Sequence, residues 1–305
     1  MQPVGPKAPC RSRSLCWPSL RSSYSAGVRH AAEVGHDVPR FISVTVSSDA
    51  FKSGDVALFV DSRQRRRLVV LESGGQFHSH AGVIPHDDVI GGPVCSEHRS
   101  TQGARWMVAR PTLEDFVLTM PRGAQVIYPK DLAAMCTLAD VGPGMRVFET
   151  GVGSGALSIA LLRLGADVTG YEIREDFATR AGRNVRLFLG EGVDDRYHVH
   201  LRDSYEPLGH DGFDRAMLDL PEPWRVVPHL ADALVPGGVL CAYTPSITQA
   251  TAVRQSLSTG WFDVRTLEVL HRTWHIEGLA VRPDHRMVAH TAFLTVARRS
   301  PPTAR

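Results

Sequence analysis

The sequence predicts an α/β protein with a doubly wound, mostly parallel Rossmann-like sheet, preceded by a small N-terminal β-domain. From residue 146 onward, apolar strand patterns alternate with helical patterns, which is typical of a parallel sheet with helices on both faces. Between residues 51 and 110 short strands are separated by turns instead. Two late strands, 262–270 and 291–299, predict an antiparallel pair that closes the main sheet.

Length and composition limit the number of domains and the kinds of partner and compartment that fit this chain. The chain of 305 residues is long enough for one large domain and a smaller one. Its net charge of +2 permits a polyanionic partner without requiring one. The five cysteines form no C-x-x-C pair, which favours a reducing compartment and no zinc site. No apolar run is long enough for a membrane span, so we expect a cytoplasmic protein with no metal and no membrane partner.

Residues 1–48 form a low-complexity extension rich in serine, arginine and proline, with no acidic residue before Glu33. Such a composition cannot build a core, so we expect this segment to be disordered. Three interpretations stay open: an organellar targeting segment, an arm that contacts RNA, and an extension without function. We favour the third because the segment shows neither an amphipathic period nor a cleavage signal.

A hairpin with an arginine-rich turn opens the predicted β-domain, residues 49–110. Its strands span 54–61 and 67–73. The turn indicates either a solvated loop or a contact to phosphate groups, and these two interpretations are equally favoured. The cluster consists of Arg63, Arg65, Arg66 and Arg67.

Histidines follow in the same domain. His78 and His80 stand in an H-x-H spacing, which places both imidazoles on one face of a strand. His86, Asp87 and Asp88 follow a proline. No cysteine or further histidine has a familiar ligand spacing, so we expect polar packing between domains in preference to a metal site.

Strand and helix signals alternate through the predicted domain 111–300. Pro129 favours the start of a helix, and Gly142-Pro143-Gly144 marks its end. The predicted strands of this domain span 146–150, 166–172, 197–203, 213–220 and 237–244. The predicted helices span 129–140, 157–165, 174–190 and 246–260, with another that begins near Pro223.

The most informative stretch is the turn between the first of these strands and its helix. Gly151, Gly153 and Gly155 alternate there, as expected where the backbone takes positive φ and touches a ligand without a Cβ in the way. The free N–H groups at the start of the helix point into the same crevice. Glu172 ends the second strand about 20 residues later, where a carboxylate accepts both hydroxyls of a ribose. This unit predicts a nucleoside cofactor.

The glycine spacing separates two cofactors. A dinucleotide fingerprint requires G-x-G-x-x-G, but its third glycine position is Ala156, and Gly155 stands one place early. The G-x-G-x-G spacing favours S-adenosylmethionine over NAD, and therefore a methyltransferase over a dehydrogenase. A structural turn without a ligand is the remaining alternative.

Ligands of such sheets bind at the carboxyl ends of the strands. Asp203 ends the third strand, where it suits either an adenine amino group or a turn cap. Asp219 ends the fourth strand within DLPEPW, where Pro221 and Pro223 hold the backbone rigid. A carboxylate beside Trp224 suits a base that has been taken out of its stack. For Trp224 itself, a core anchor is the stronger interpretation.

Several stretches together resemble the tRNA (adenine-N1) methyltransferase family, whose members methylate the T-loop adenine at position 58 of tRNA. The long final stretch is peculiar to this family. Ala289 stands where a glycine is expected before His290, and the first 45 residues are not covered. The matching stretches are FHSHAGVIPHD, MPRGAQVIYPKD, ETGVGSGALS, LDLPEPW and HRTWHIEGLAVRPDHRMVAHTAFL.

The resemblance implies an N-terminal β-domain, a C-terminal S-adenosylmethionine-dependent methyltransferase domain and, in bacteria, a homotetramer. It implies that Asp219, Tyr128 and His290 lie at the target adenine as catalytic residues. The residues that it implies for the cofactor are Gln125, Glu149, Gly151, Gly153, Ser154, Gly155, Ala156, Glu172, Asp203 and Asp219.

The implied chemistry is a direct displacement. The lone pair of adenine N1 lies in the plane of the ring and can attack the sulfonium methyl in line, so the enzyme mainly positions two reactants. We expect Asp219 to accept a hydrogen bond from the exocyclic amine and to stabilise the charge that develops on the purine. N1 lies on the Watson–Crick edge, so the base must be extruded from folded tRNA. Candidate contacts to tRNA are Arg63 to Arg67, Arg110, Arg122, Arg272, Arg282 and Arg286.

Two other functions stay open from the sequence. One is a methyltransferase for another RNA, a small molecule or a protein. The other is a non-catalytic RNA-binding subunit, against which the intact glycine loop, Glu172 and Asp219 argue.

Overall fold

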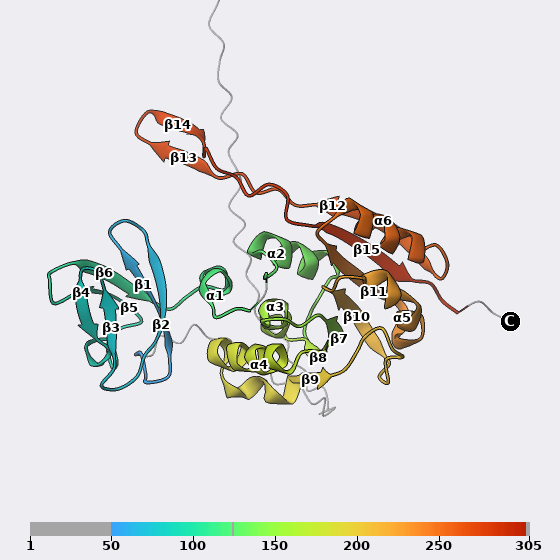
Figure 1. Ribbon diagram of the computed structural model, residues 1–305, viewed down its shortest axis with the longest axis horizontal. Helices are drawn as coiled ribbons and strands as arrows, with labels where there is room; N and C mark the ends of the chain where they lie inside the picture. Colours follow the sequence, from blue (N-terminus) through green and yellow to red (C-terminus); the bar gives the residue numbers. More distant parts are fainter. Residues whose placement is uncertain (1–49, 124, 303–305) are drawn as a thin grey trace, which may run out of the picture. The chain divides into compact units, whose positions relative to one another are not determined.

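The computed structural model describes residues 50–123 and 125–302 (Figure 1). The predicted extension, residues 1–48, lies outside them. The described chain contains a four-stranded sheet followed by a seven-stranded one, which confirms the predicted order of a small β-region and a Rossmann-like fold. The exact limits given for the two domains stay predictions, as does the cytoplasmic location. In the described part of the chain, we find no helix with the length and apolar character that crossing a membrane requires.

The N-terminal β-region is an antiparallel sheet in the order β2-β1-β6-β5, accompanied by the β3–β4 hairpin. The predicted first hairpin is confirmed, because Val56 pairs with Val70 across β1 and β2. Three aromatic rings form its core: Phe77 lies 4.5 Å from Phe59 and 4.9 Å from Trp106 between ring centroids. The elements are β1 (Val56–Asp61), β2 (Arg66–Val70), β3 (Gln76–Ser79), β4 (Gly82–Pro85), the 3-10 helix η1 (His86–Asp88), β5 (Cys95–Arg99) and β6 (Arg105–Ala109).

The main sheet has the order β12-β15-β11-β10-β7-β8-β9. Its strands are β7 (Arg146–Thr150), β8 (Asp167–Glu172), β9 (Tyr197–Leu201), β10 (Phe213–Leu218), β11 (Leu234–Thr244), β12 (Trp261–Glu268) and β15 (Phe293–Arg299). Five strands are parallel, and β15 runs antiparallel to both β11 and β12. The predicted antiparallel closure is therefore confirmed.

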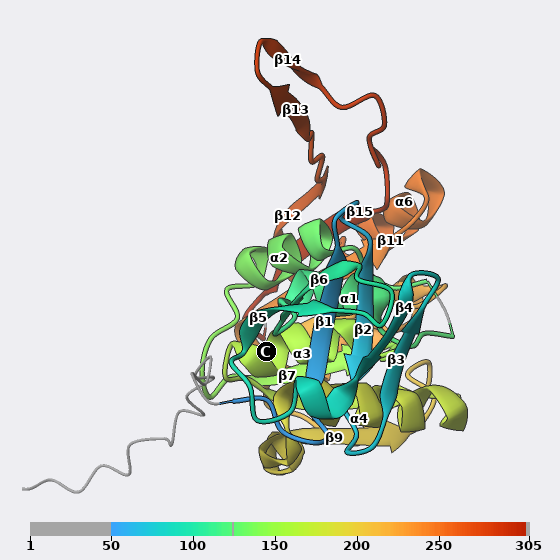
Figure 2. The same cartoon turned by 90° about the vertical axis from the view of Figure 1, so that its left-hand side faces the viewer.

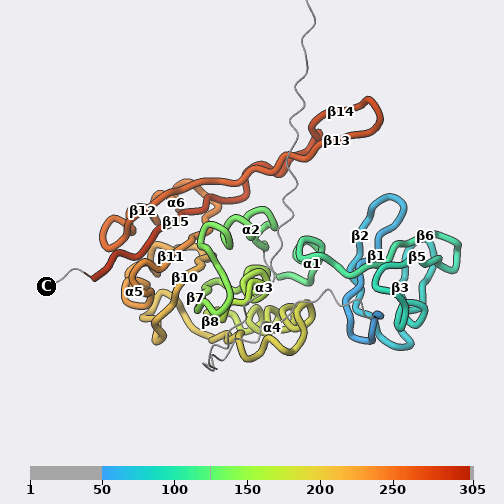
Figure 3. Tube along the Cα trace, turned by 180° about the vertical axis from the view of Figure 1, so that it is seen from behind, coloured from blue at the N-terminus to red at the C-terminus, as the bar shows by residue number. Residues whose placement is uncertain are grey.

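Helices cover both faces of this sheet, as Figures 1 and 3 show. Alternate strand residues divide between two cores: Val147 and Met217 pack on one face with α2, α3 and α4, whereas Phe148 and Leu218 pack on the other with α5 and α6. This alternation is what a strand buried on both sides requires. The helical segments are α2 (Pro129–Leu138), α3 (Ala156–Arg163), α4 (Glu175–Leu189), η2 (Glu191–Arg196), η3 (Pro223–Arg225), α5 (Val227–Ala233) and α6 (Ile247–Ser256).

The strand order reverses at β7. From β7 the chain proceeds through β8 and β9 on one side, and then returns to β10 and β11 on the other. The connections that leave β7 and β10 therefore diverge, and such a divergence opens a crevice at the carboxyl ends of the two strands. Gly151 and Asp219, the residues that directly follow β7 and β10, lie at this point.

Besides strand β5 and the 3-10 helix η2, a short helix and a hairpin were not predicted from the sequence. Helix α1 (Leu113–Thr119) begins with a capping box in which the side chains of Thr112 and Asp115 each accept from the other residue's backbone N–H. The β13–β14 hairpin (Trp274–Glu277 and Ala280–Pro283) extends from the main sheet, as Figure 2 shows. Its side chains, Ile276 and Val281 among them, are largely exposed, so no core fixes it within the described chain.

Candidate active site

A cavity of about 540 Å³ lies at the carboxyl ends of β7, β8 and β10. Its position is the crevice that the reversal of strand order creates. Aromatic and proline side chains form much of its wall, among them Tyr171, Phe177 and Pro245. The predicted site residues that line it are Gln125, Gly151, Gly153, Glu172, Asp203 and Asp219.

The glycine loop has the backbone that the sequence predicts. Gly151, Gly153 and Gly155 have φ values of +79°, +58° and +84°. A Cβ on Gly151 would lie 1.7 Å from the carbonyl oxygen of Asp219, so only glycine allows the two loops to approach. A Cβ on Gly153 would have its nearest neighbour at 3.7 Å, and this glycine lines the cavity. The loop therefore offers bare backbone to a ligand.

Glu172 is held rigidly beside this loop. Its Oε2 accepts a hydrogen bond of 3.0 Å from the backbone N–H of Gly153, and its Oε1 accepts one of 3.0 Å from Arg174. The residue is 7% exposed and lines the cavity. Two backbone donors therefore fix both oxygens at the end of β8, where ribose hydroxyls were expected.

Asp219 has a different environment. Its side chain keeps some surface toward the cavity but is otherwise surrounded by protein, and no described residue donates a hydrogen bond to its carboxylate. Burial raises the pKa of Asp219 to about 7, and the nearby charge of Glu172 adds to this. The cavity wall thus carries an acceptor that the protein itself leaves free.

The surroundings of Asp203 and Trp224 agree with the structural roles that the sequence left open, a turn cap and a core anchor. Asp203 lines the cavity, but its Oδ1 also accepts from the backbone N–H of Tyr205 at 2.8 Å, as a turn cap does. Trp224 packs against the core on the α5–α6 face and does not line the cavity, as a core anchor would. The DLPEPW loop is held by Gln249, whose side chain donates to the carbonyl of Pro221 at 2.9 Å.

Glu149, Ser154, Gly155 and Ala156 do not line the cavity. Glu149 is buried in β7 and accepts a hydrogen bond of 2.7 Å from Ser158 of α3, while its Oε1 has no hydrogen-bond partner among the described residues. Burial raises the pKa of Glu149 to about 8, and the charges of Asp219 and Glu172 act in the same direction. The motif spacing places all four near the glycine loop, but burial decides which of them face a ligand.

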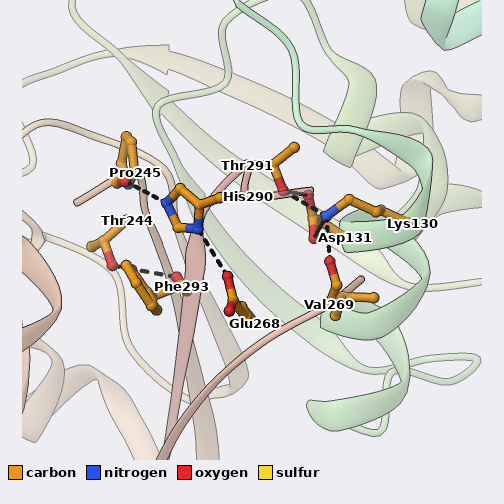
Figure 4. A network of polar contacts seen from close by, with 9 residues as sticks. All are labelled: Lys130, Asp131, Thr244, Pro245, Glu268, Val269, His290, Thr291 and Phe293. Carbon is orange, nitrogen blue, oxygen red and sulfur yellow. Dashed lines mark hydrogen bonds and ion pairs between the residues drawn. The ribbon is translucent and has the colours of Figure 1, made fainter. Parts of the chain in front are cut away.

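His290 and Tyr128 lie outside the cavity lining. His290 contacts Glu268 through Nδ1 and the carbonyl oxygen of Pro245 through Nε2, both at 2.9 Å (Figure 4). The Pro245 carbonyl and the Glu268 carboxylate raise the pKa of His290, because both acceptors favour the protonated ring. Since Pro245 lines the cavity, His290 is one hydrogen bond away from it.

A buried ion-pair network near these residues was not predicted. Lys130 donates through Nζ to Asp131 at 2.9 Å, to the carbonyl of Val269 at 2.7 Å and to Thr291 at 2.6 Å (Figure 4). Thr291 in turn donates to the other oxygen of Asp131 at 2.6 Å. The network joins the start of α2, next to Tyr128, to the segment before β15. It therefore holds both sequence-predicted residues in place.

The histidines of the β-region show no metal-binding arrangement. The backbone N–H of Glu72 donates to Nδ1 of His86 at 3.0 Å, so this buried ring packs as a polar core residue. Within residues 50–123 and 125–302, no group of three or more His, Cys, Asp or Glu side chains is arranged to hold a metal ion.

Both regions match models of known families. Residues 105–281 match the family described as tRNA methyltransferase complex GCD14 subunit, and residues 50–96 match the TrmI-like N-terminal family. The tRNA (adenine(58)-N(1))-methyltransferase TrmI of Thermus thermophilus is 40% identical over 247 residues, which cover 79% of this chain and 96% of that protein. The chain belongs to this family of tRNA methyltransferases.

Other family members and solved structures agree along most of the chain. The tRNA (adenine(57)-N(1)/adenine(58)-N(1))-methyltransferase TrmI of Methanocaldococcus jannaschii is 30% identical, covering 80% of this chain and 95% of that protein. The tRNA (m1A58) methyltransferase TrmI of Aquifex aeolicus superposes with a TM-score of 0.73 at 28% identity, covering 83% of this chain and 100% of that one. A structure described as an S-adenosylmethionine-dependent O-methyltransferase from Thermotoga maritima superposes with a TM-score of 0.79 at 30% identity, covering 84% of this chain and 97% of that one.

Proposed function

We propose that this chain transfers a methyl group from S-adenosylmethionine to N1 of adenine 58 in the T-loop of tRNA. The observation that carries the proposal is the placement of Asp219, a carboxylate without a protein donor in the described chain, in the same cavity wall as Glu172 and the glycine loop. The relatives named for this reaction support the choice of acceptor.

The residues of the cavity fit S-adenosylmethionine. Glu172 is fixed where it can accept the two ribose hydroxyls. Asp203 lies at the same wall, and its Oδ2, which accepts no hydrogen bond from the described residues, is available for an adenine amino group. Gly153 leaves open space beside its backbone, so a ligand can approach the N-terminal end of α3. When bound, this cofactor supplies the sulfonium methyl group.

Asp219 recognises the acceptor base in this scheme. Its carboxylate accepts a hydrogen bond from the exocyclic amine of adenine, which orients N1 toward the methyl donor. Positive charge develops on the purine as N1 attacks, and the carboxylate stabilises that charge inside a cavity of low dielectric. Burial strengthens this interaction but also raises the pKa of Asp219 to about 7, so the residue has to lose its proton first.

Tyr128 and His290 complete the acceptor side. Tyr128 is half-buried at the start of α2, and in this scheme its ring packs beside the extruded base. His290 is held between the Glu268 carboxylate and the carbonyl oxygen of Pro245, one contact behind the cavity wall, so we assign it to positioning the cavity rim. The buried network of Lys130 fixes the segments that carry both residues.

The β13–β14 hairpin supports association of several copies, as in the homotetramer implied for bacterial members. Ile276 is 73% exposed and Leu279 is fully exposed at the hairpin tip. A two-stranded hairpin with exposed apolar side chains is marginally stable in isolation, and a second copy would bury them. Sedimentation of the wild-type chain and of Ile276→Ser tests this: an assembled wild type and a smaller variant are expected, and a monomeric wild type would contradict it.

The reaction is tested by identifying the methylated nucleoside. The purified protein is incubated with S-adenosylmethionine and unmodified tRNA. The RNA is then digested, and the nucleosides are separated and identified by mass spectrometry. We expect 1-methyladenosine, which carries the methyl group on the base. Methyl incorporation on ribose oxygen would favour the O-methyl chemistry in the description of the Thermotoga maritima structure. An absence of cofactor binding in calorimetry would instead favour a non-catalytic RNA-binding subunit.

A further inference from the structure

A second hollow, of about 200 Å³, lies in the N-terminal β-region. It unites the two motifs of this region that the methyl-transfer site does not use, the arginine-rich turn and the H-x-H pair. The charged and polar side chains stand above an aromatic floor. The main lining residues are Arg65, Arg67, His78, His80, Phe77 and Trp106.

Arg65 is the neutralised member of this cluster. Its Nε forms an ion pair with Asp61 at 2.6 Å, and its Nη2 contacts Nε2 of His80 at 3.0 Å. Arginine can only donate, so Nε2 of His80 accepts and the ring carries its proton on Nδ1. These contacts fix Arg65 and His80 in place and leave the imidazole N–H of His80 available as a donor.

Arg67 has a different environment from Arg65. Its Nη1 donates to the backbone carbonyl of Arg66 at 2.9 Å, and among the described residues it has no carboxylate partner. Arg66 differs, because it pairs with Asp115 at the start of α1. Within residues 50–123 and 125–302, Arg67 is therefore the arginine of the turn that brings an uncompensated charge to the wall of the hollow.

The floor of the hollow is rigid. The rings of Phe77 and Trp106 meet edge to face at 4.9 Å, and both residues are buried in the sheet core. The Nε1 of Trp106 is a buried donor that finds no acceptor in the described chain. An unsatisfied N–H of this kind is rare in native proteins.

We propose that this hollow binds a phosphate group of the RNA backbone, with Arg67 as the charged contact and His78 and His80 as further donors. The inference rests on the proposed function, which supplies RNA as the polyanion. A guanidinium fork suits the oxygens of a phosphodiester, and such a contact fixes the position of an RNA without reading its sequence. The hollow would therefore orient tRNA rather than select the target base.

The test measures binding of unmodified tRNA to the full chain over a range of salt concentrations. Arg67→Gln removes the charge, and Arg67→Lys retains it. The control is Arg105→Gln, which makes the same charge change on β6 next to Trp106 but does not line the hollow. Thermal unfolding of each variant checks that the fold is retained.

We expect Arg67→Gln to weaken binding several-fold at low salt and to reduce the slope of log Kd against log salt by about one, with Arg67→Lys retaining the slope. Arg105→Gln is expected to bind within about two-fold of wild type, as surface charges off the contact do. An unchanged slope in Arg67→Gln, or an equal loss in Arg105→Gln, would overturn the inference. Methyl transfer by the wild-type protein to the same tRNA distinguishes failure of this inference from failure of the proposed function, because an absence of methyl transfer would reject the proposed function.

Discussion

Replacing Gly151 by alanine tests whether the glycine loop and the loop of Asp219 act as one unit. A Cβ at this position would lie 1.7 Å from the carbonyl oxygen of Asp219 and 2.6 Å from its carbonyl carbon. Both atoms belong to the backbone, so the clash cannot be relieved by a side-chain rotation. The left-handed conformation, with φ of +79°, costs about 1–2 kcal/mol for alanine. Overpacking adds about 1–3 kcal/mol.

The Asp219 peptide therefore has to move by about 1.8 Å to lengthen the 1.7 Å approach to an ordinary contact distance of about 3.5 Å. A displacement of even about 1 Å at a catalytic group costs on the order of a hundredfold in rate. Gly153→Ala is the matched control, since its φ is also positive but its Cβ would meet nothing closer than 3.7 Å. We expect Gly151→Ala to lose about a hundredfold in kcat at saturating cofactor and tRNA.

Gly153→Ala should instead lose cofactor affinity with a much smaller change in kcat, because its Cβ would enter the cavity that Gly153 lines. Kinetics at saturating and limiting cofactor separate the two effects, and thermal unfolding reports the difference in stability. Full kcat in Gly151→Ala, or equal kcat losses in both variants, would show that the contact with Asp219 does not control the rate.

Three further perturbations follow from the buried carboxyl groups. Asp219→Asn should keep cofactor affinity but lose about a hundredfold or more in kcat. In the wild type, the raised pKa of this carboxyl should make kcat/KM rise with pH up to about 7, and the variant should lose this rise. Full activity of the variant would refute the role of Asp219. Glu149 has a pKa of about 8 in the folded protein against 4.5 when unfolded, so the folded state loses stability as pH rises between these values. Urea titrations should find Glu149→Gln more stable than wild type at pH 8 by roughly a few kcal/mol. An equal dependence of the unfolding free energy on pH in wild type and variant would contradict this. Lys130→Met leaves the carboxylate of Asp131 buried without its cation and should lower the free energy of unfolding by about 3–5 kcal/mol. The double variant Lys130→Met/Asp131→Leu should recover much of this stability. No recovery would argue that a buried unpaired charge is not the cause of the loss.

The sheet and the cofactor side of the cavity could be predicted because local signals specify them. Consecutive apolar residues such as Val147 and Phe148 predict a strand buried on both faces. Gly151 and Glu172 then follow from their positions at strand ends, where a doubly wound sheet places ligands. The arrangement of Asp219 opposite the glycine loop is a consequence of strand order, which the alternating pattern constrains.

The missed parts depend on contacts between distant residues or on very short signals. Lys130 and Thr291 are 161 positions apart, and no periodicity indicates that they meet. Helix α1 is only seven residues long, and its capping pair is its main sequence signal. The burial of Glu149 below the loop also could not be predicted from the motif, because spacing along the chain does not tell which side of β7 faces the cavity.

Methylation at N1 of adenine 58 is tested most directly by primer extension on two tRNA transcripts, one with adenine at position 58 and one with guanine. A methyl group on N1 blocks the Watson–Crick edge, so reverse transcription should stop beside the modified base. We predict a stop at position 58 that requires the protein, S-adenosylmethionine and the adenine. Methyl incorporation into both transcripts without a stop at this position would contradict the account, since it would place the methyl group on another atom or another nucleotide.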